Sequence, residues 1–189
     1  MRKLILVKHA KPVLVSGKPA NSWLLSEEGR KSCPALAERL REHQPDIIIT
    51  SSEPKANETG LLVSEALGIP FETAPGLHEH ERSTTPLIND PAAWEALVKE
   101  FFERPDELVF GDETASQARV RFSDAIDTIL NQYPEETLVI ACHGTVISLY
   151  AGQVAGVDPF PLWQRLHLPS YVVFSRPDME ILEIVEKIS

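Results

Sequence analysis

The 189-residue sequence has little cysteine: Cys33 and Cys142 are the only two. Two cysteines are too few for a disulfide framework in a chain of this length, and no metal site built on thiolates is expected. Apolar runs are short as well. The run from Leu4 to Val7 is ended by Lys8, well short of the core of a signal peptide or the length of a membrane span. We therefore expect a cytoplasmic protein that is not associated with a membrane.

Basic residues are outnumbered by acidic ones, with 18 Lys and Arg against 28 Asp and Glu and a formal net charge of −10. Such a surface repels nucleic acid, so no nucleic-acid partner is expected. The sequence also lacks low-complexity segments, charge runs and internal repeats. With 43% hydrophobic residues, the composition is typical of a globular protein. We expect residues 1–189 to form a single domain.

Short apolar runs alternate with helix-like patterns along the chain. Buried strands are predicted at residues 4–7, 46–50 and 137–141, and a later hairpin or sheet edge at 171–174 and 181–185. Helices are predicted from the N-cap Ser26 towards Pro45, at 56–67, 91–103 and 114–132, and from Gly144 onwards. This alternation predicts an α/β fold, a mostly parallel sheet with helices on both faces.

Residues with cationic, imidazole and hydroxyl side chains directly follow the first three predicted strands. Lys8 and His9 follow the first strand, a hydroxyl-rich segment ending at Lys55 follows the second, and His143 follows the third. Ligands of open α/β sheets bind at the carboxyl ends of strands, so these side chains should meet. Imidazoles beside ammonium and hydroxyl groups suit a compact anion such as a phosphoryl group. A histidine there can attack phosphorus if a neighbour fixes its tautomer and cations keep its reacting nitrogen unprotonated.

Six segments carry short motifs in a recognisable order. They are residues 6–10 (Leu-Val-Lys-His-Ala), 25–29 (Leu-Ser-Glu-Glu-Gly), 50–59 (Thr-Ser-Ser-Glu-Pro-Lys-Ala-Asn-Glu-Thr), 77–79 (Leu-His-Glu), 111–114 (Gly-Asp-Glu-Thr) and 142–145 (Cys-His-Gly-Thr). In this order they resemble the histidine phosphatase superfamily, the phosphoglycerate-mutase-like enzymes. The resemblance implies a phosphoglycerate-mutase-like fold.

The resemblance also implies roles for individual residues. His9 is similar to the family's nucleophile, which becomes phosphohistidine, Glu79 to its proton donor, and His143 to its second pocket histidine. Lys8 and Lys55 stand where the family has two phosphate-binding arginines. The implied activity is that of a phosphomonoester hydrolase of the histidine acid phosphatase type, acting on a small phosphorylated substrate or a phosphoprotein without metal or organic cofactor.

Hydrolysis is favoured over mutase action, because the stretch between Glu79 and Gly111 is too modest to enclose a sugar-acid phosphate and exclude water. Three aromatic residues of that stretch, Trp94, Phe101 and Phe102, are candidates for a lid over the pocket.

One alternative is a regulatory protein that binds anions without turnover. Lysine keeps the charge of arginine but lacks its planar fork, and both arginines are replaced together, at Lys8 and Lys55. The glycine that follows the nucleophile in the family is Ala10 here.

A second alternative is a metal-dependent hydrolase that uses His78 and His80. Alternate residues of a strand face the same way, so these two histidines would converge if the segment were a strand. By the same reasoning Glu81 would face the same way as Glu79, which leaves two candidates for the acid.

Overall fold

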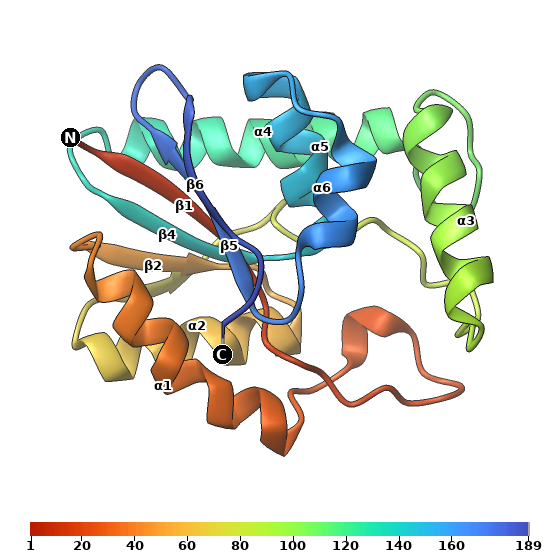
Figure 1. Cartoon of the computed structure of the whole chain (residues 1–189), viewed down its shortest axis with the longest axis horizontal. Helices are drawn as coiled ribbons and strands as arrows, with labels where there is room; N and C mark the ends of the chain where they lie inside the picture. Colours follow the sequence, from red (N-terminus) through yellow and green to blue (C-terminus); the bar gives the residue numbers. More distant parts are fainter. Residues whose placement is uncertain (189) are drawn as a thin grey trace.

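The computed structural model describes residues 1–188 and contains one six-stranded sheet between layers of helices (Figure 1). The strand order is β3-β2-β4-β1-β5-β6. The first four strands in this order are parallel, and β5 and β6 are antiparallel additions at one edge. The predicted α/β class is confirmed. The bounds are β1 (Lys3–Lys8), β2 (Ile47–Thr50), β3 (Phe71–Thr73), β4 (Leu138–Cys142), β5 (Ser170–Ser175) and β6 (Ile181–Val185).

Helices cover both faces of the sheet, as predicted (Figure 1). One face carries α1 (Glu27–Arg41) and α2 (Pro54–Leu67), and the other carries α4 (Ala115–Gln132), α5 (Gly144–Ala155) and α6 (Pro159–Arg165). The remaining helical segments are η1 (Ala20–Ser22) and α3 (Pro91–Glu103). The sequence did not predict β3 or α6, because three and seven residues are too few to show a periodicity. No helix in residues 1–188 is long and apolar enough to cross a membrane.

Strand β1 lies in the centre of the sheet and is apolar on both faces. Leu4 and Leu6 pack in the core with α4 and α5, while Ile5 and Val7 pack in the core with α1 and α2. All four side chains are 0% or 1% exposed. A strand that is covered on both faces has a continuous run of apolar residues in its sequence. The first polar residues after this run, Lys8 and His9, mark the point where the chain leaves the core.

The parallel register brings the carboxyl ends of three strands to one level. Lys8 of β1 pairs with Cys142 of β4, and Thr50 of β2 pairs with Ala141. The next residues of the three strands, His9, Ser51 and His143, therefore emerge at the same edge of the sheet, as the sequence predicted.

Candidate active site

His9 is fixed in one tautomer by its own backbone. Its Nδ1 lies 2.8 Å from the carbonyl oxygen of Ala10, and because a carbonyl can only accept, Nδ1 carries the proton. The lone pair of Nε2 is therefore free. Burial lowers the pKa of His9 well below its usual value of 6.5, and the adjacent His143 and Lys55 lower it further. Near neutral pH His9 is a neutral imidazole, the state in which it can act as a nucleophile.

His143 precedes α5 and is completely buried, with its ring centroid 5.3 Å from that of His9. Its Nε2 lies 2.9 Å from the hydroxyl of Ser51, which already accepts the backbone N–H of Glu53 at 3.2 Å. Either group can be the donor in this contact, because the hydroxyl can accept two hydrogen bonds and also carries a proton of its own. Nδ1 of His143 has no partner among the described residues. Burial, followed by Lys55, lowers the pKa of His143 well below its usual value, so the ring is neutral near pH 7.

Lys8 lies against the start of α5. Its ammonium donates to the carbonyl of Leu166 at 2.5 Å, and a Cβ atom at Gly144 would come within 2.9 Å of its side chain. Burial lowers the pKa of Lys8 to about 8, against the opposing effect of the Glu79 carboxylate. Lys8 is thus mainly cationic at neutral pH, but it is poised to lose its charge in mild alkali.

Glu79 accepts two backbone N–H groups, from His80 at 2.9 Å and from Thr145, in the first turn of α5, at 3.2 Å. Burial is the largest influence on its pKa and raises it, but the effects of His143, Arg82 and the His80 amide outweigh burial. The pKa of Glu79 therefore lies below its usual value, and the free protein holds an ionised carboxylate at this position.

Residues 78–82 form a loop, so the expectation that alternate residues there face the same way is wrong. The side chain of Glu81 is 52% exposed, and its carboxylate bonds to His78 at 3.0 Å. His80 is buried instead, with Nε2 3.0 Å from the carbonyl of Glu113. The two histidines do not converge, and residues 1–188 contain no cluster of three or more side chains that could hold a metal ion.

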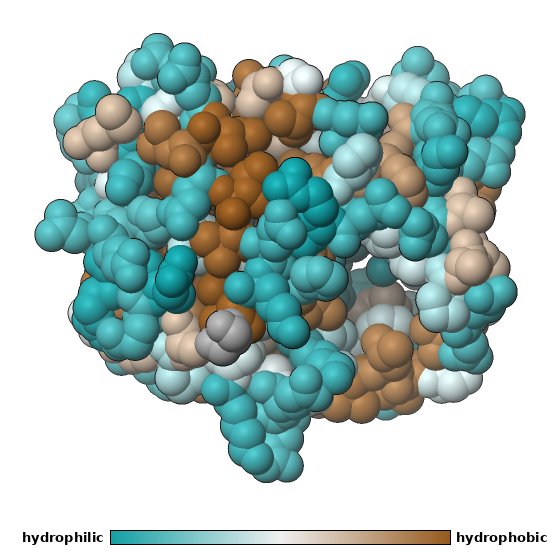
Figure 2. All heavy atoms as spheres, viewed as in Figure 1, coloured by the Kyte–Doolittle hydropathy of each residue, from teal (hydrophilic) through white to brown (hydrophobic). Residues whose placement is uncertain are grey.

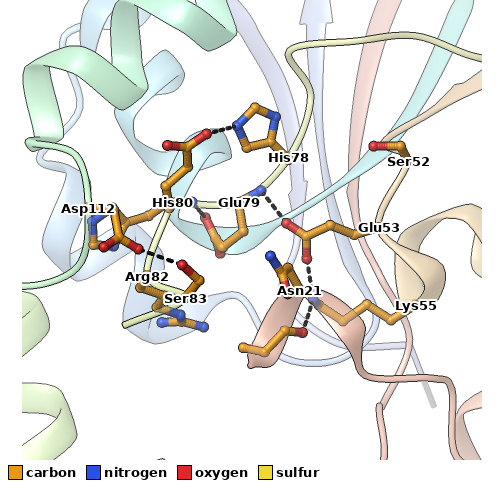
Figure 3. Close-up of a pocket in the computed structure, with 12 residues that line it drawn as sticks. Asn21, Ser52, Glu53, Lys55, His78, Glu79, His80, Arg82, Ser83 and Asp112 are labelled. Carbon is orange, nitrogen blue, oxygen red and sulfur yellow. Dashed lines mark hydrogen bonds and ion pairs between the residues drawn. The ribbon is translucent and has the colours of Figure 1, made fainter. Parts of the chain in front are cut away.

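Lys55 is paired with a carboxylate that the sequence analysis missed. Its ammonium donates to the carbonyl of Ala20 at 2.8 Å and to the carboxylate of Glu53 (Figure 3). The other carboxylate oxygen of Glu53 accepts the backbone N–H of Glu79 at 2.9 Å and lies 3.8 Å from Nε2 of His143. Burial is the largest influence on the pKa of Glu53 and raises it, but Lys55, the backbone N–H of Glu79 and His9 together outweigh burial, so Glu53 is ionised. The sequence analysis predicted a pocket for an anion, and a carboxylate is not expected in such a pocket because like charges repel.

A cavity of about 530 Å³ opens in front of these groups. Lys8, His9 and His143 do not line it, and His143 is completely buried next to Glu53. Arg82 is the second residue that the sequence analysis missed, because it lies in a loop without periodicity. The lining residues are Ala20, Asn21, Ser52, Glu53, Lys55, His78, Glu79, His80, Glu81, Arg82, Ser83 and Asp112.

The three candidate lid residues lie in different surroundings in the structure. Trp94 lines a smaller neighbouring cavity, whereas Phe101 is fully buried in a cluster with Ala115, Ala118 and Leu149. Phe102 packs against that same cluster. The lid expectation is therefore wrong for Phe101, which is a core residue.

The fold and the site together define an α/β protein with two buried histidines beside lysines at the carboxyl ends of parallel strands. The chain belongs to the histidine phosphatase superfamily (branch 1), whose family model matches residues 4–179. This membership confirms the resemblance seen in the sequence.

Individual relatives are phosphatases. The chain is 26% identical over 159 residues to the metal-independent phosphoserine phosphatase of Arabidopsis thaliana, and 22% identical over 135 residues to the uncharacterized phosphatase PhoE of Bacillus subtilis. These matches cover 77% and 71% of this chain but only 65% and 66% of the relatives' lengths. Among solved structures, a mycobacterial glucosyl-3-phosphoglycerate phosphatase superimposes with a TM-score of 0.80 at 19% identity, covering 100% of both chains. This structural match shows the shared fold.

Proposed function

We propose that this protein hydrolyses phosphomonoesters through a covalent phosphohistidine on His9, with Glu79 as the proton donor. The observation that carries the proposal is the state of His9: its Nδ1–H is fixed on the carbonyl of Ala10, and its pKa is lowered well below 6.5, which leaves Nε2 unprotonated. Membership of the family and the phosphatase relatives support it. The substrate class is a small phosphorylated compound, and residues 1–189 act as one domain.

The first step transfers the phosphoryl group to His9. Lys8, Lys55 and His143 bind the phosphoryl oxygens and stabilise the charge that develops on them. Nε2 of His9 attacks phosphorus in line, and the ester P–O bond breaks. Glu79 protonates the departing oxygen. Because the bound phosphoryl group adds negative charge beside Glu79, it raises the pKa of this carboxyl, which takes up the proton of a monoanionic substrate.

The second step releases phosphate. Glu79 is again a carboxylate after the first step, and it removes a proton from a water molecule that attacks phosphorus. The N–P bond breaks, inorganic phosphate leaves with the proton that Glu79 had taken from water, and His9 and Glu79 return to their starting states. No metal or organic cofactor takes part in either step. Cys33 and Cys142 are free and buried, which suits the reducing cytoplasm proposed as the place of action.

Trapping of the phosphoenzyme tests this proposal. Wild-type protein is mixed with phosphorus-labelled phenyl phosphate and quenched in alkaline denaturant, since N–P bonds hydrolyse in acid. We expect label on the peptide that contains His9, and steady turnover that a chelator leaves unchanged. Saturable phosphate binding without label or turnover would contradict the proposal in favour of an anion-binding protein. Loss of activity with the chelator would contradict it in favour of a metal-dependent hydrolase.

The pH dependence of kcat/KM should report the ammonium of Lys8. Its pKa of about 8 means that it is charged below pH 8 and neutral above it, so kcat/KM should fall as pH rises through 8. On the acid side, His9 stays unprotonated to well below pH 6.5. The matched variant is Lys8→Arg, because arginine stays charged throughout this range. We expect the alkaline fall to disappear in Lys8→Arg, and an identical fall in both proteins would refute the assignment.

Replacing Glu53 by glutamine should strengthen the binding of phosphate. The change removes the negative charge beside Lys55 but keeps an oxygen that can accept the backbone N–H of Glu79. We expect the Kd of inorganic phosphate, measured by calorimetry, to fall on the order of tenfold, the size of one repulsion in a partly buried site. Glu81→Gln is the control and should stay within about twofold, since exposed charges interact weakly. Weaker binding in Glu53→Gln would instead show that this carboxylate aligns Lys55 for the anion.

A further inference from the structure

Arg82 presents a guanidinium group without a protein partner. Its central carbon lies over the ring of Trp94, 4.6 Å from the ring centroid, and the residue is half-buried. Within residues 1–188, no hydrogen bond or ion pair of the guanidinium is observed, so its five N–H donors remain available for a ligand. Trp94 is itself held by Phe110, at a centroid distance of 5.5 Å. Stacking of this kind fixes the plane of the guanidinium before a ligand arrives.

Arg82 and Ala20 line both the large cavity and a second cavity of about 190 Å³. Trp23 lines this second cavity. Its ring N–H already donates to the carbonyl of Lys18 at 3.2 Å, so only the apolar carbon atoms of its ring are available to contact a ligand. An apolar cavity of about 150 Å³ is enough to bind benzene. The apolar lining residues are Leu14, Trp23, Pro86, Leu87, Ile88 and Trp94.

The two cavities differ in charge. The large cavity is lined by the carboxylates of Glu53, Glu79, Glu81 and Asp112 and by two cationic residues, Lys55 and Arg82. The charged residues that line the second cavity are both cationic, Lys18 and Arg82. The space-filling view shows a hollow on the right of this face with apolar residues bordering it below, on the side of the N-terminal segment that carries η1 (Figures 1 and 2). An uncharged apolar group attached to an anion matches this combination of an apolar wall with a cation at its edge.

We infer that the substrates of this protein are phosphomonoesters whose leaving group is compact, uncharged and apolar, about the size of one aromatic ring. This inference rests on the proposed function. The second cavity holds the apolar group, and Arg82, where the cavities meet, donates to a phosphoryl oxygen. The same contacts form in the ground state and in the transition state, so they lower KM and leave kcat nearly unchanged.

Binding of two phosphonates tests the inference without interference from leaving-group acidity. In benzylphosphonate a methylene replaces the ester oxygen of phenyl phosphate, and methylphosphonate lacks the ring. Calorimetry on wild-type protein should show benzylphosphonate binding at least about tenfold more tightly, which corresponds to about 1.4 kcal/mol. Leu87→Asn should remove most of this preference and leave the affinity for methylphosphonate unchanged. Leu61→Asn, at a leucine of α2 that is 40% exposed and outside both cavities, is the matched control and should retain the preference.

Two further measurements separate the inference from a structural role of these residues. Arg82→Gln should weaken both phosphonates by a similar factor, about tenfold, because Arg82 binds the group they share. Leu87→Asn should raise the KM of phenyl phosphate at an unchanged kcat, and Ile88→Thr should repeat the result if Leu87→Asn does not fold. Equal affinities for the two phosphonates, or a preference that survives both substitutions in the cavity, would overturn the inference alone. If neither methylphosphonate nor inorganic phosphate binds, the proposed function fails as well.

Discussion

Replacing His9 by alanine is expected to abolish phosphomonoester hydrolysis, with kcat lowered by about 10⁴-fold or more. In the proposed mechanism the bond to phosphorus forms at Nε2 of this ring, which is unprotonated because Nδ1 holds the ring hydrogen on the carbonyl of Ala10. Alanine removes the atom that carries the intermediate. Steady-state turnover of 4-nitrophenyl phosphate measures the loss, and the same sample should yield no labelled phosphoenzyme.

Phosphate binding provides the internal control for His9→Ala. Lys8, Lys55 and His143 remain in place, so inorganic phosphate should bind to the variant with an affinity close to that of the wild type. His167→Ala is the matched substitution, since His167 is an exposed histidine outside both cavities, and it should leave turnover unchanged. Turnover of His9→Ala within tenfold of the wild type would mean that another group attacks phosphorus.

Replacing Glu79 by glutamine should slow the hydrolysis of alkyl phosphates by about 10²- to 10⁴-fold, the usual contribution of a general acid. Glutamine can still accept the backbone N–H groups of His80 and Thr145, but it has no proton to give to the leaving oxygen. An alkoxide is a poor leaving group without that proton, whereas 4-nitrophenolate leaves as a stable anion. The burst of phosphoryl transfer from 4-nitrophenyl phosphate should therefore be nearly unchanged, as measured by stopped flow.

The second role proposed for Glu79, activation of water, predicts a different change in the same variant. Without a carboxylate to activate water, dephosphorylation slows and the phosphoenzyme should accumulate after the burst. Glu81→Gln is the matched control two residues away, on a side chain that is 52% exposed, and it should behave like the wild type. An equal loss for alkyl and 4-nitrophenyl esters in the burst phase would show that Glu79 is not the proton donor to the leaving group.

Local sequence pattern was enough to predict most of the fold. The apolar runs at 4–7, 46–50 and 137–141 became the parallel strands β1, β2 and β4, because strands buried on both faces need continuous apolar residues. The helix starts were also readable. Ser26 accepts the backbone N–H of Gly29, and Thr114 forms a capping box with Gln117. These signals depend on neighbours within one turn of helix, so they are visible in the sequence.

The site was predictable where it lies directly at strand ends and not where it lies in loops. His9 and His143 come immediately after β1 and β4, so the parallel topology alone brings them to one edge. Glu81 was indistinguishable from Glu79 on the assumption that the segment was a strand. In the structure residues 78–82 form a loop, and a loop has no periodicity from which to infer the direction of a side chain.

Sequence by itself determined the alternation of strands and helices and the identity of the groups at the strand ends, because both follow from local patterns. Only the tertiary structure decided that Glu79 turns inward, that Glu53 lies beside His143 and that Arg82 lies on Trp94. The course of the loop that carries Glu79 is set by distant residues: Arg121 of α4 donates to the carbonyls of Gly76, His78 and Glu79, and also pairs with Glu113, whose carboxylate accepts the backbone N–H of Glu81. Contacts between segments more than 30 residues apart leave no local pattern, so they become visible only once the chain has folded.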